Sequence, residues 1–134
     1  MRLTLFLTYN VSLKIWAETG LLQREIRLYQ ILQRQGVMVQ LLTYGDASDR
    51  EFEGELEGIG LLPIYERIRR PRSRVLQLLQ SFLVPWVLRH EIRCSDIFKT
   101  NQMMGAWVAV VAKFCCRKPL LLRCGYELSE FLRL

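Results

Sequence analysis

Residues that bind metals or form disulfides are scarce in this chain. A single histidine, His90, occurs among 134 residues, which excludes a metal site built from several histidines. The four cysteines form no C-x-x-C pair, and Cys115 and Cys116 are adjacent within an apolar run, as buried thiols often are. We therefore expect neither a zinc site nor a disulfide framework, and a reducing compartment fits best. The chain is predicted to use no metal and no cofactor.

Long apolar runs are also missing. The longest strictly apolar run, residues 103–112, falls well short of the roughly 20 residues that cross a bilayer. The apolar run at residues 3–7 is followed by Tyr9, Asn10 and Lys14 and by no small-residue cleavage site, so it is a poor signal peptide. The predicted location is the cytoplasm, and a peripheral position at the inner face of the membrane stays open.

Several motifs of known catalytic sites are absent. No G-x-G-x-x-G follows the first apolar run and no G-x-x-x-x-G-K-[ST] occurs, which leaves a usual dinucleotide site unsupported and excludes a P-loop NTPase. The G-x-S-x-G nucleophile elbow is missing. No paired carboxylates for glycoside hydrolysis are visible at the ends of the predicted strands.

What is present favours one folded α/β domain, with a hydrophobic content of 51%. Apolar runs that start near residues 3, 37, 59, 97 and 120 predict five strands. Helical patterns alternate with them: residues 22–32 ending at Gly36, residues 75–84 ending or kinking at Pro85, and residues 105–116. Loops are expected at residues 9–19 and 43–58, and a capping box at Ser48 could open a short helix in the second loop.

This alternation predicts a Rossmann-like parallel sheet with helices on both faces. We expect the strand order 3-2-1-4-5, with its topological switch between the first and fourth strands. Ligands of such sheets lie at the carboxyl ends of the strands.

Polar residues follow three of the predicted strands. They are Tyr9, Asn10, Ser12 and Lys14 after the first, Thr100, Asn101 and Gln102 after the fourth, and Arg123, Gly125, Tyr126 and Glu127 after the fifth. Gly20 and Gly105 each precede a predicted helix, where free backbone donors favour an anion. Amides, hydroxyls and one guanidinium suit a sugar or a ligand that carries phosphate.

Each of these residues also has a structural explanation. Asn101 could cap the following helix, Gly105 could allow close packing, and Arg123 could pair with Glu127 or Glu130. Trp16 and Trp107 are expected to be packing residues. Lys14 and Tyr126 are the best functional candidates, because a long polar side chain at a strand end has little role in a core.

Charge is unevenly distributed along a chain whose net charge is +6. An acidic stretch at residues 46–57 is followed by a basic segment at residues 67–74, which contains Arg67, Arg69, Arg70, Arg72 and Arg74. The basic segment suggests an anionic partner such as a membrane surface or a phosphate, although a solvated loop without a partner explains it equally well. We expect no nucleic acid, because no recognised binding fold accompanies it.

Together these segments resemble the amino-terminal domain of group 1, family-4-like glycosyltransferases of the two-Rossmann (GT-B) architecture. The resemblance rests on residues 5–14, 20–26, 41–46, 95–102, 105–107 and 118–126, taken in order. One departure is Cys124, which stands where the family often has a histidine before the glycine that follows the fifth strand.

The resemblance implies that residues 1–134 form a single, incomplete amino-terminal domain that binds the acceptor, a sugar or a lipid-linked molecule. The nucleotide-sugar donor would be held by a carboxy-terminal domain that these residues do not encode, so the chain is expected to be inactive alone. The alternative is a non-catalytic binding or membrane-docking module that uses the basic segment at 67–74.

Overall fold

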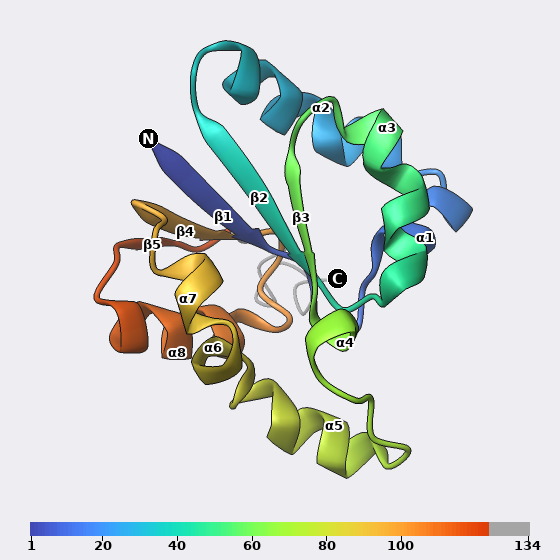
Figure 1. Cartoon of the computed structure of the whole chain (residues 1–134), viewed down its shortest axis with the longest axis vertical. Helices are drawn as coiled ribbons and strands as arrows, with labels where there is room; N and C mark the ends of the chain where they lie inside the picture. The colour runs from blue at the N-terminus through green and yellow to red at the C-terminus, as the bar shows by residue number, and fades with distance from the viewer. Residues whose placement is uncertain (124–134) are drawn as a thin grey trace, which may run out of the picture.

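The computed structural model describes residues 1–123, which fold around a five-stranded parallel sheet (Figure 1). The strands are β1 (Arg2–Phe6), β2 (Met38–Thr43), β3 (Gly60–Pro63), β4 (Ile97–Thr100) and β5 (Leu120–Leu121). They lie in the order β3-β2-β1-β4-β5, and every pair is parallel. The predicted fold class, strand order and switch point between β1 and β4 are confirmed.

The central strand β1 supplies apolar side chains to both faces of the sheet. Leu3, Leu5 and Leu7 belong to one buried cluster, and Phe6 belongs to the other. Because successive side chains of a strand point to opposite faces, a continuous apolar run is what a strand covered on both sides requires.

Four elements cover the first face: α1 (Leu13–Glu18), α2 (Leu22–Arg34), the 3-10 helix η1 (Ala47–Phe52) and α3 (Glu53–Leu56). Ile26 and Tyr29 of α2 pack in this cluster with Leu41 of β2. The spacing of buried residues along α2 gives one apolar stripe, which is what holds an amphipathic helix on a sheet.

The second face is covered by α6 (Val84–Val87), α7 (Arg89–Ile92) and α8 (Ala106–Cys116). Phe6 of β1 and Phe98 of β4 meet edge to face at 5.4 Å beneath these helices. Strand β3 leads directly into α4 (Ile64–Arg67), and α5 (Arg74–Ser81) extends away from the sheet (Figure 1).

Helix α1 lies within the segment that was predicted to be a loop, so that prediction was wrong. The Ser12 side chain caps α1 by accepting from the Ile15 N–H at 3.2 Å, and Leu13 and Trp16 are buried one turn apart. Trp16 is a packing residue, as expected. The helix has only 6 residues, and a helix so short depends on tertiary contacts.

Two helix boundaries also differ from expectation. Asp46, and not Ser48, caps the 3-10 helix, because its side chain accepts from the Ser48 N–H. Helix α5 ends at Ser81, before Pro85. Pro85 instead lies in the first turn of α6, where its missing N–H is not needed.

Within residues 1–123, no helix has both the length and the apolar character that crossing a bilayer requires.

Candidate functional site

The loops that follow the strands are tied to one another by backbone hydrogen bonds. The Tyr9 N–H donates to Met104 O at 3.2 Å, the Tyr44 N–H to Val11 O at 3.1 Å, and the Tyr65 N–H to Gly45 O at 2.9 Å. These bonds join the loops after β4, β1, β2 and the start of α4. The carboxyl edge of the sheet is therefore a connected rim.

Tyr9 lies at the centre of an aromatic cluster on this rim. Its ring meets Tyr44 edge to face at 5.4 Å and lies 5.2 Å from the ring of Trp107. The Trp107 Nε1–H in turn donates to Ser81 Oγ at 2.9 Å. Trp107 is therefore a packing residue, as expected, and it connects α8 to the end of α5.

A buried carboxylate that the sequence did not single out organises the neighbouring loop. The Asp49 side chain accepts from the Leu13 and Lys14 N–H groups at 3.2 and 3.3 Å and from the Thr43 hydroxyl at 2.7 Å. A Cβ on residue 45 would collide with this carboxylate, so Gly45 is required beside it. The two free amides that begin α1 are thus bound by the chain's own anion.

A cavity of about 550 Å³ opens between the loops that follow β1, β2 and β3. Its lining combines amide, hydroxyl and charged groups from residues Asn10, Ser12, Lys14, Ile15, Glu18, Tyr44, Gly45, Asp46, Ser48, Asp49, Tyr65, Arg69 and Arg70. The hydrogen bonds from Ser48 are the main reason that the pKa of Asp46 is lowered, and nearby Lys14 acts in the same direction. A cavity of this composition suits a hydroxylated ligand.

The two tyrosines that line the cavity remain protonated at neutral pH. Burial raises the pKa of Tyr44, and the neighbouring Tyr65 and Tyr9 act in the same direction. Burial also raises the pKa of Tyr65, opposed by the positive charge of Arg70. Both hydroxyls can therefore donate as well as accept hydrogen bonds.

Two asparagines at the rim have a buried amide oxygen that accepts no hydrogen bond within residues 1–123: Asn10 and Asn101. Asn10 has the left-handed backbone that asparagine tolerates, with φ 60°. Asn101 does not cap α8, whose N-cap is Gly105. A buried acceptor without a donor is uncommon in a folded protein and marks a place where a ligand donor would be stabilising.

Gly105 brings the loop after β4 against the loop after β1. It has φ 93°, and a Cβ there would lie 2.7 Å from the Tyr9 nitrogen. Its close-packing explanation therefore holds in the structure. Asn101, Gln102 and Gly105 all belong to the loop after β4, and none of the three lines the cavity.

The remaining predicted site residues lie elsewhere. Gly20 is in the turn between α1 and α2 and does not line the cavity. The Arg123 side chain pairs with Glu25 of α2 at 3.3 Å. The backbone N–H of Arg123 donates to the buried Thr100 hydroxyl at 3.1 Å. Cys124, Gly125, Tyr126 and Glu127 lie outside the described residues.

The basic segment is divided between two roles. Arg67 pairs with Glu91 of α7 at 2.9 Å. Arg69 and Arg70 line the cavity, and the Arg70 guanidinium lies over the Tyr65 ring at 5.2 Å. The sequence did not place these arginines at the strand ends, because they follow the short helix α4 that begins directly after β3.

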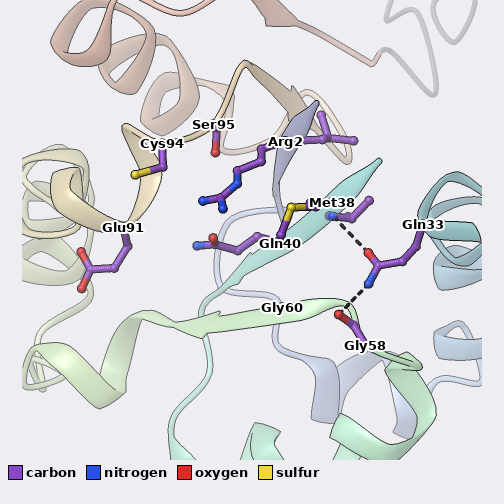
Figure 2. Close-up of a pocket in the computed structure, with 11 residues that line it drawn as sticks. Arg2, Gln33, Met38, Gln40, Gly58, Gly60, Glu91, Cys94 and Ser95 are labelled. Atoms are coloured by element: carbon purple, nitrogen blue, oxygen red, sulfur yellow. Dashed lines mark hydrogen bonds between the residues drawn. The ribbon is translucent and has the colours of Figure 1, made fainter. Parts of the chain in front are cut away.

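A smaller cavity of about 220 Å³ lies at the opposite, amino-terminal edge of the sheet. Figure 2 shows Arg2, Gln40 and Cys94 around it, and Gln33 bonded across its side to Gly58 O at 2.6 Å and to the Val39 N–H at 3.1 Å. Ligands of parallel α/β sheets lie at the other edge. We therefore take the cavity at the carboxyl edge as the candidate functional site.

No protein-family model matches the sequence, and a comparison with curated proteins gives no match. Among solved structures, the chain is similar to a glycosyltransferase from Rickettsia africae ESF-5, with a TM-score of 0.53 and 17% identity over 90% of this chain and 28% of that chain. It is also similar to the glycosyltransferase of kitacinnamycin, with a TM-score of 0.58 and 18% identity over 90% of this chain and 29% of that chain.

At these identities the likeness establishes the fold. The chain spans less than a third of each glycosyltransferase that it matches. The resemblance noted in the sequence is thus confirmed in the fold, for a segment that is one part of a larger architecture in both of those proteins.

Proposed function

We propose that residues 1–134 are the acceptor-binding half of a glycosyltransferase that transfers a sugar from a nucleotide-sugar donor. The observation that carries this proposal is the cavity at the carboxyl edge of the sheet, whose lining includes Asn10 with its buried, unpartnered amide oxygen. The similarity in fold to two glycosyltransferases supports it.

The composition of the cavity favours an acceptor over a nucleotide. The backbone donors at the start of α1, where a phosphate would otherwise find a positive helix end, are already used by Asp49. The lining also offers hydroxyls and the Asn10 amide, which exchange hydrogen bonds with the hydroxyls of a sugar. Charged side chains of both signs, among them Lys14 and Glu18, lie beside them. Donor binding would then fall to residues outside this segment, and the segment alone would be inactive.

The test is an NMR titration of the full chain with methyl glycosides of common hexoses and, separately, with UDP-glucose and GDP-mannose. We expect at least one glycoside to shift the amide signals of Asn10, Ser12 and Tyr44, and neither nucleotide sugar to be consumed. Turnover of a nucleotide sugar by this chain alone would contradict the proposal.

The variant that tests the site is Asn10→Gly. Glycine accepts the left-handed backbone of residue 10, so the fold is kept while the amide oxygen is removed. We expect glycoside binding to weaken in Asn10→Gly and to be unchanged in Gln35→Ala, which removes an exposed amide at the end of α2. Equal binding by both variants would show that the glycoside lies elsewhere.

A second candidate function, membrane docking, is favoured by the unusual orientation of α5. The buried residues of this helix are polar, Gln77 and Ser81. Most large apolar side chains of α5 and of the segment through α6 are instead 41–65% exposed, and Val84 is the buried exception. The exposed ones are Val75, Leu76, Leu78, Leu79, Phe82, Leu83, Trp86 and Val87. Exposed apolar residues beside arginines are typical of helices that lie in the interface of an anionic membrane.

Sedimentation with vesicles tests this candidate. We expect the chain to bind vesicles of phosphatidylcholine with phosphatidylglycerol, and to lose binding in a Leu79→Ser/Leu83→Ser variant and in the Arg69→Ala/Arg70→Ala/Arg72→Ala variant. The matched control is Leu28→Ser/Ile31→Ser, which removes exposed apolar side chains from α2. Equal loss in the control, or no binding at all, would rule out docking by α5.

A further inference from the structure

A second cavity at the carboxyl edge, of about 490 Å³, adjoins the candidate site and has three arginines in its lining. Its lining consists of Tyr9, Asn10, Arg70, Arg72, Arg74, Gln77 and Leu78. Asn10 and Arg70 line both cavities, so the two are adjacent at these residues. The lining of the candidate site includes acidic side chains, whereas the lining of this second cavity includes none.

The arginines of this second cavity are not neutralised by the described chain. Within residues 1–123, no carboxylate lies within ion-pair distance of Arg70, Arg72 or Arg74. This differs from Arg67, which pairs with Glu91, and from Arg50, which pairs with Glu66 at 2.9 Å. Three like charges around one cavity repel each other, and an anion placed among them would remove that repulsion.

The backbone that carries these arginines is held in place by two amide side chains of α5. The Gln77 Nε2–H donates to Pro71 O at 2.7 Å, and the Gln80 Nε2–H donates to Arg69 O at 3.0 Å. Gln77 is buried, which is uncommon for glutamine. The loop is thereby positioned by its own helix, and the Arg70 guanidinium is further held over Tyr65.

Asn10 supplies a second kind of contact at the junction of the two cavities. Its amide oxygen is buried and accepts no hydrogen bond within residues 1–123, so it lacks a donor such as a ligand hydroxyl. Guanidinium groups provide planar pairs of donors that match the oxygens of a phosphoryl group. The junction therefore combines one acceptor for a hydroxyl with several donors for an anion.

We propose that this second cavity binds a phosphoryl group of the acceptor, through Arg70, Arg72 and Arg74, while a hydroxyl of the same molecule donates to Asn10. The inference rests on the proposed function and narrows the acceptor to a hydroxylated molecule that carries phosphate. Such a group is present both in soluble sugar or polyol phosphates and in phospholipid headgroups.

The experiment is an NMR titration of the full chain with glycerol 1-phosphate, inorganic phosphate and glycerol. We expect glycerol 1-phosphate to bind more tightly than the other two, and Arg70→Gln/Arg72→Gln to weaken it by at least about tenfold, since charged hydrogen bonds are lost. The control Arg27→Gln/Arg89→Gln removes the same charge from exposed positions on α2 and α7 and should bind normally. Equal weakening in the control, or no binding of glycerol 1-phosphate or of anionic vesicles, would overturn the inference.

Asn10→Gly separates the hydroxyl contact from the anion contact. It should weaken the binding of glycerol 1-phosphate and leave that of inorganic phosphate unchanged, because only the former carries alcohol hydroxyls away from the phosphoryl group. If glycerol 1-phosphate is unaffected, Asn10 has no part in the site and that half of the inference is wrong.

Two further comparisons assign the source of the phosphate and separate this inference from the proposed function. The source is a lipid headgroup if the chain binds phosphatidylglycerol vesicles but not glycerol 1-phosphate, and if Arg70→Gln/Arg72→Gln abolishes the vesicle binding. The source is a soluble phosphate if glycerol 1-phosphate binds in solution. If uncharged glycosides bind through Asn10 while neither phosphate source binds, the phosphate inference fails and the proposed function stands. If none of these probes binds, both fail.

Discussion

Gly105 lies directly against Tyr9, so that a Cβ at residue 105 would be 2.7 Å from the Tyr9 nitrogen and 3.0 Å from the Tyr9 Cβ. The neighbouring atom is backbone, which cannot turn aside as a side chain could. The close approach joins the loop after β4 to the loop after β1 at the switch point of the sheet.

Gly105→Ala should therefore destabilise the protein more than Gly36→Ala. Both glycines have φ 93°, but nothing lies within 4 Å of a Cβ at Gly36. Each variant carries the backbone strain of a left-handed alanine, about 1 kcal/mol, and Gly105→Ala adds an overpacking cost of about 1–3 kcal/mol. Urea denaturation measures the difference. Equal losses of stability would mean that the Tyr9 loop moves away without cost.

Asp49→Ala should be among the more destabilising substitutions at the rim. It leaves the buried Thr43 hydroxyl and the Leu13 N–H without their acceptor, and unsatisfied buried groups cost about 1–3 kcal/mol each. Asp46→Ala, which removes an exposed helix cap, should cost about 1 kcal/mol. Asp49→Asn should lose less stability than Asp49→Ala, because the amide oxygen of asparagine can still accept a hydrogen bond. A smaller loss for Asp49→Ala than for Asp46→Ala would contradict the described role of Asp49.

The stability of the chain should depend on the Arg50–Glu66 pair in mild acid. Two hydrogen bonds of 2.9 Å join the guanidinium to the carboxylate, and they are the main cause of the lowered pKa of Glu66. Because the folded protein holds Glu66 ionised, its contribution is present above the unfolded pKa and is lost as the pH falls through the lower folded pKa.

Glu66→Gln should flatten this part of the acid stability profile, with a loss at neutral pH of at most about 1 kcal/mol because the pair is exposed. Glu51→Gln is the control, since Glu51 forms no ion pair within residues 1–123. Denaturant midpoints measured from neutral pH down to acid would show the difference. An unchanged profile in Glu66→Gln would rule out the pair as its source.

Leu79→Ser should have little effect on the stability of the isolated chain. Leu79 is 58% exposed, whereas Leu41 is fully buried between β1 and β3. We expect a change below about 0.5 kcal/mol for the exposed site and a loss of about 2–5 kcal/mol for Leu41→Ala. A loss in Leu79→Ser that approaches that of Leu41→Ala would show that α5 packs against the body of the domain.

The sheet could be predicted because each apolar run is separated from the next by a helical pattern, and connected parallel strands follow a restricted set of orders. The wall of the site formed by Tyr44 to Asp49 was missed. The acidic composition of residues 43–58 indicated only a loop, and Leu13, whose N–H donates to Asp49, lies 36 positions earlier in the chain. No local sequence pattern indicates a contact between residues so far apart in the chain.

Helix α1 did leave a signal in the sequence, a serine followed by apolar residues at positions 13 and 16, one helical turn apart. The polar residues around them concealed it. Asn10, Ser12 and Lys14 were predicted as site residues because they directly follow a central strand, and they line the candidate cavity. The arginines at residues 69 and 70 were predicted as an anion contact, but their place in the cavity depends on the turn made by α4.

Asp49 has a consequence for what this domain can become. Its carboxylate lies at a helix start, the place where other α/β folds bind a phosphate. The Leu13 and Lys14 N–H groups already donate to this carboxylate and are not free for a ligand. Freeing these two amides for a phosphate would first require removal of that carboxylate, and the Thr43 hydroxyl would then need a new acceptor. The fold itself therefore occupies the two backbone donors at the start of α1.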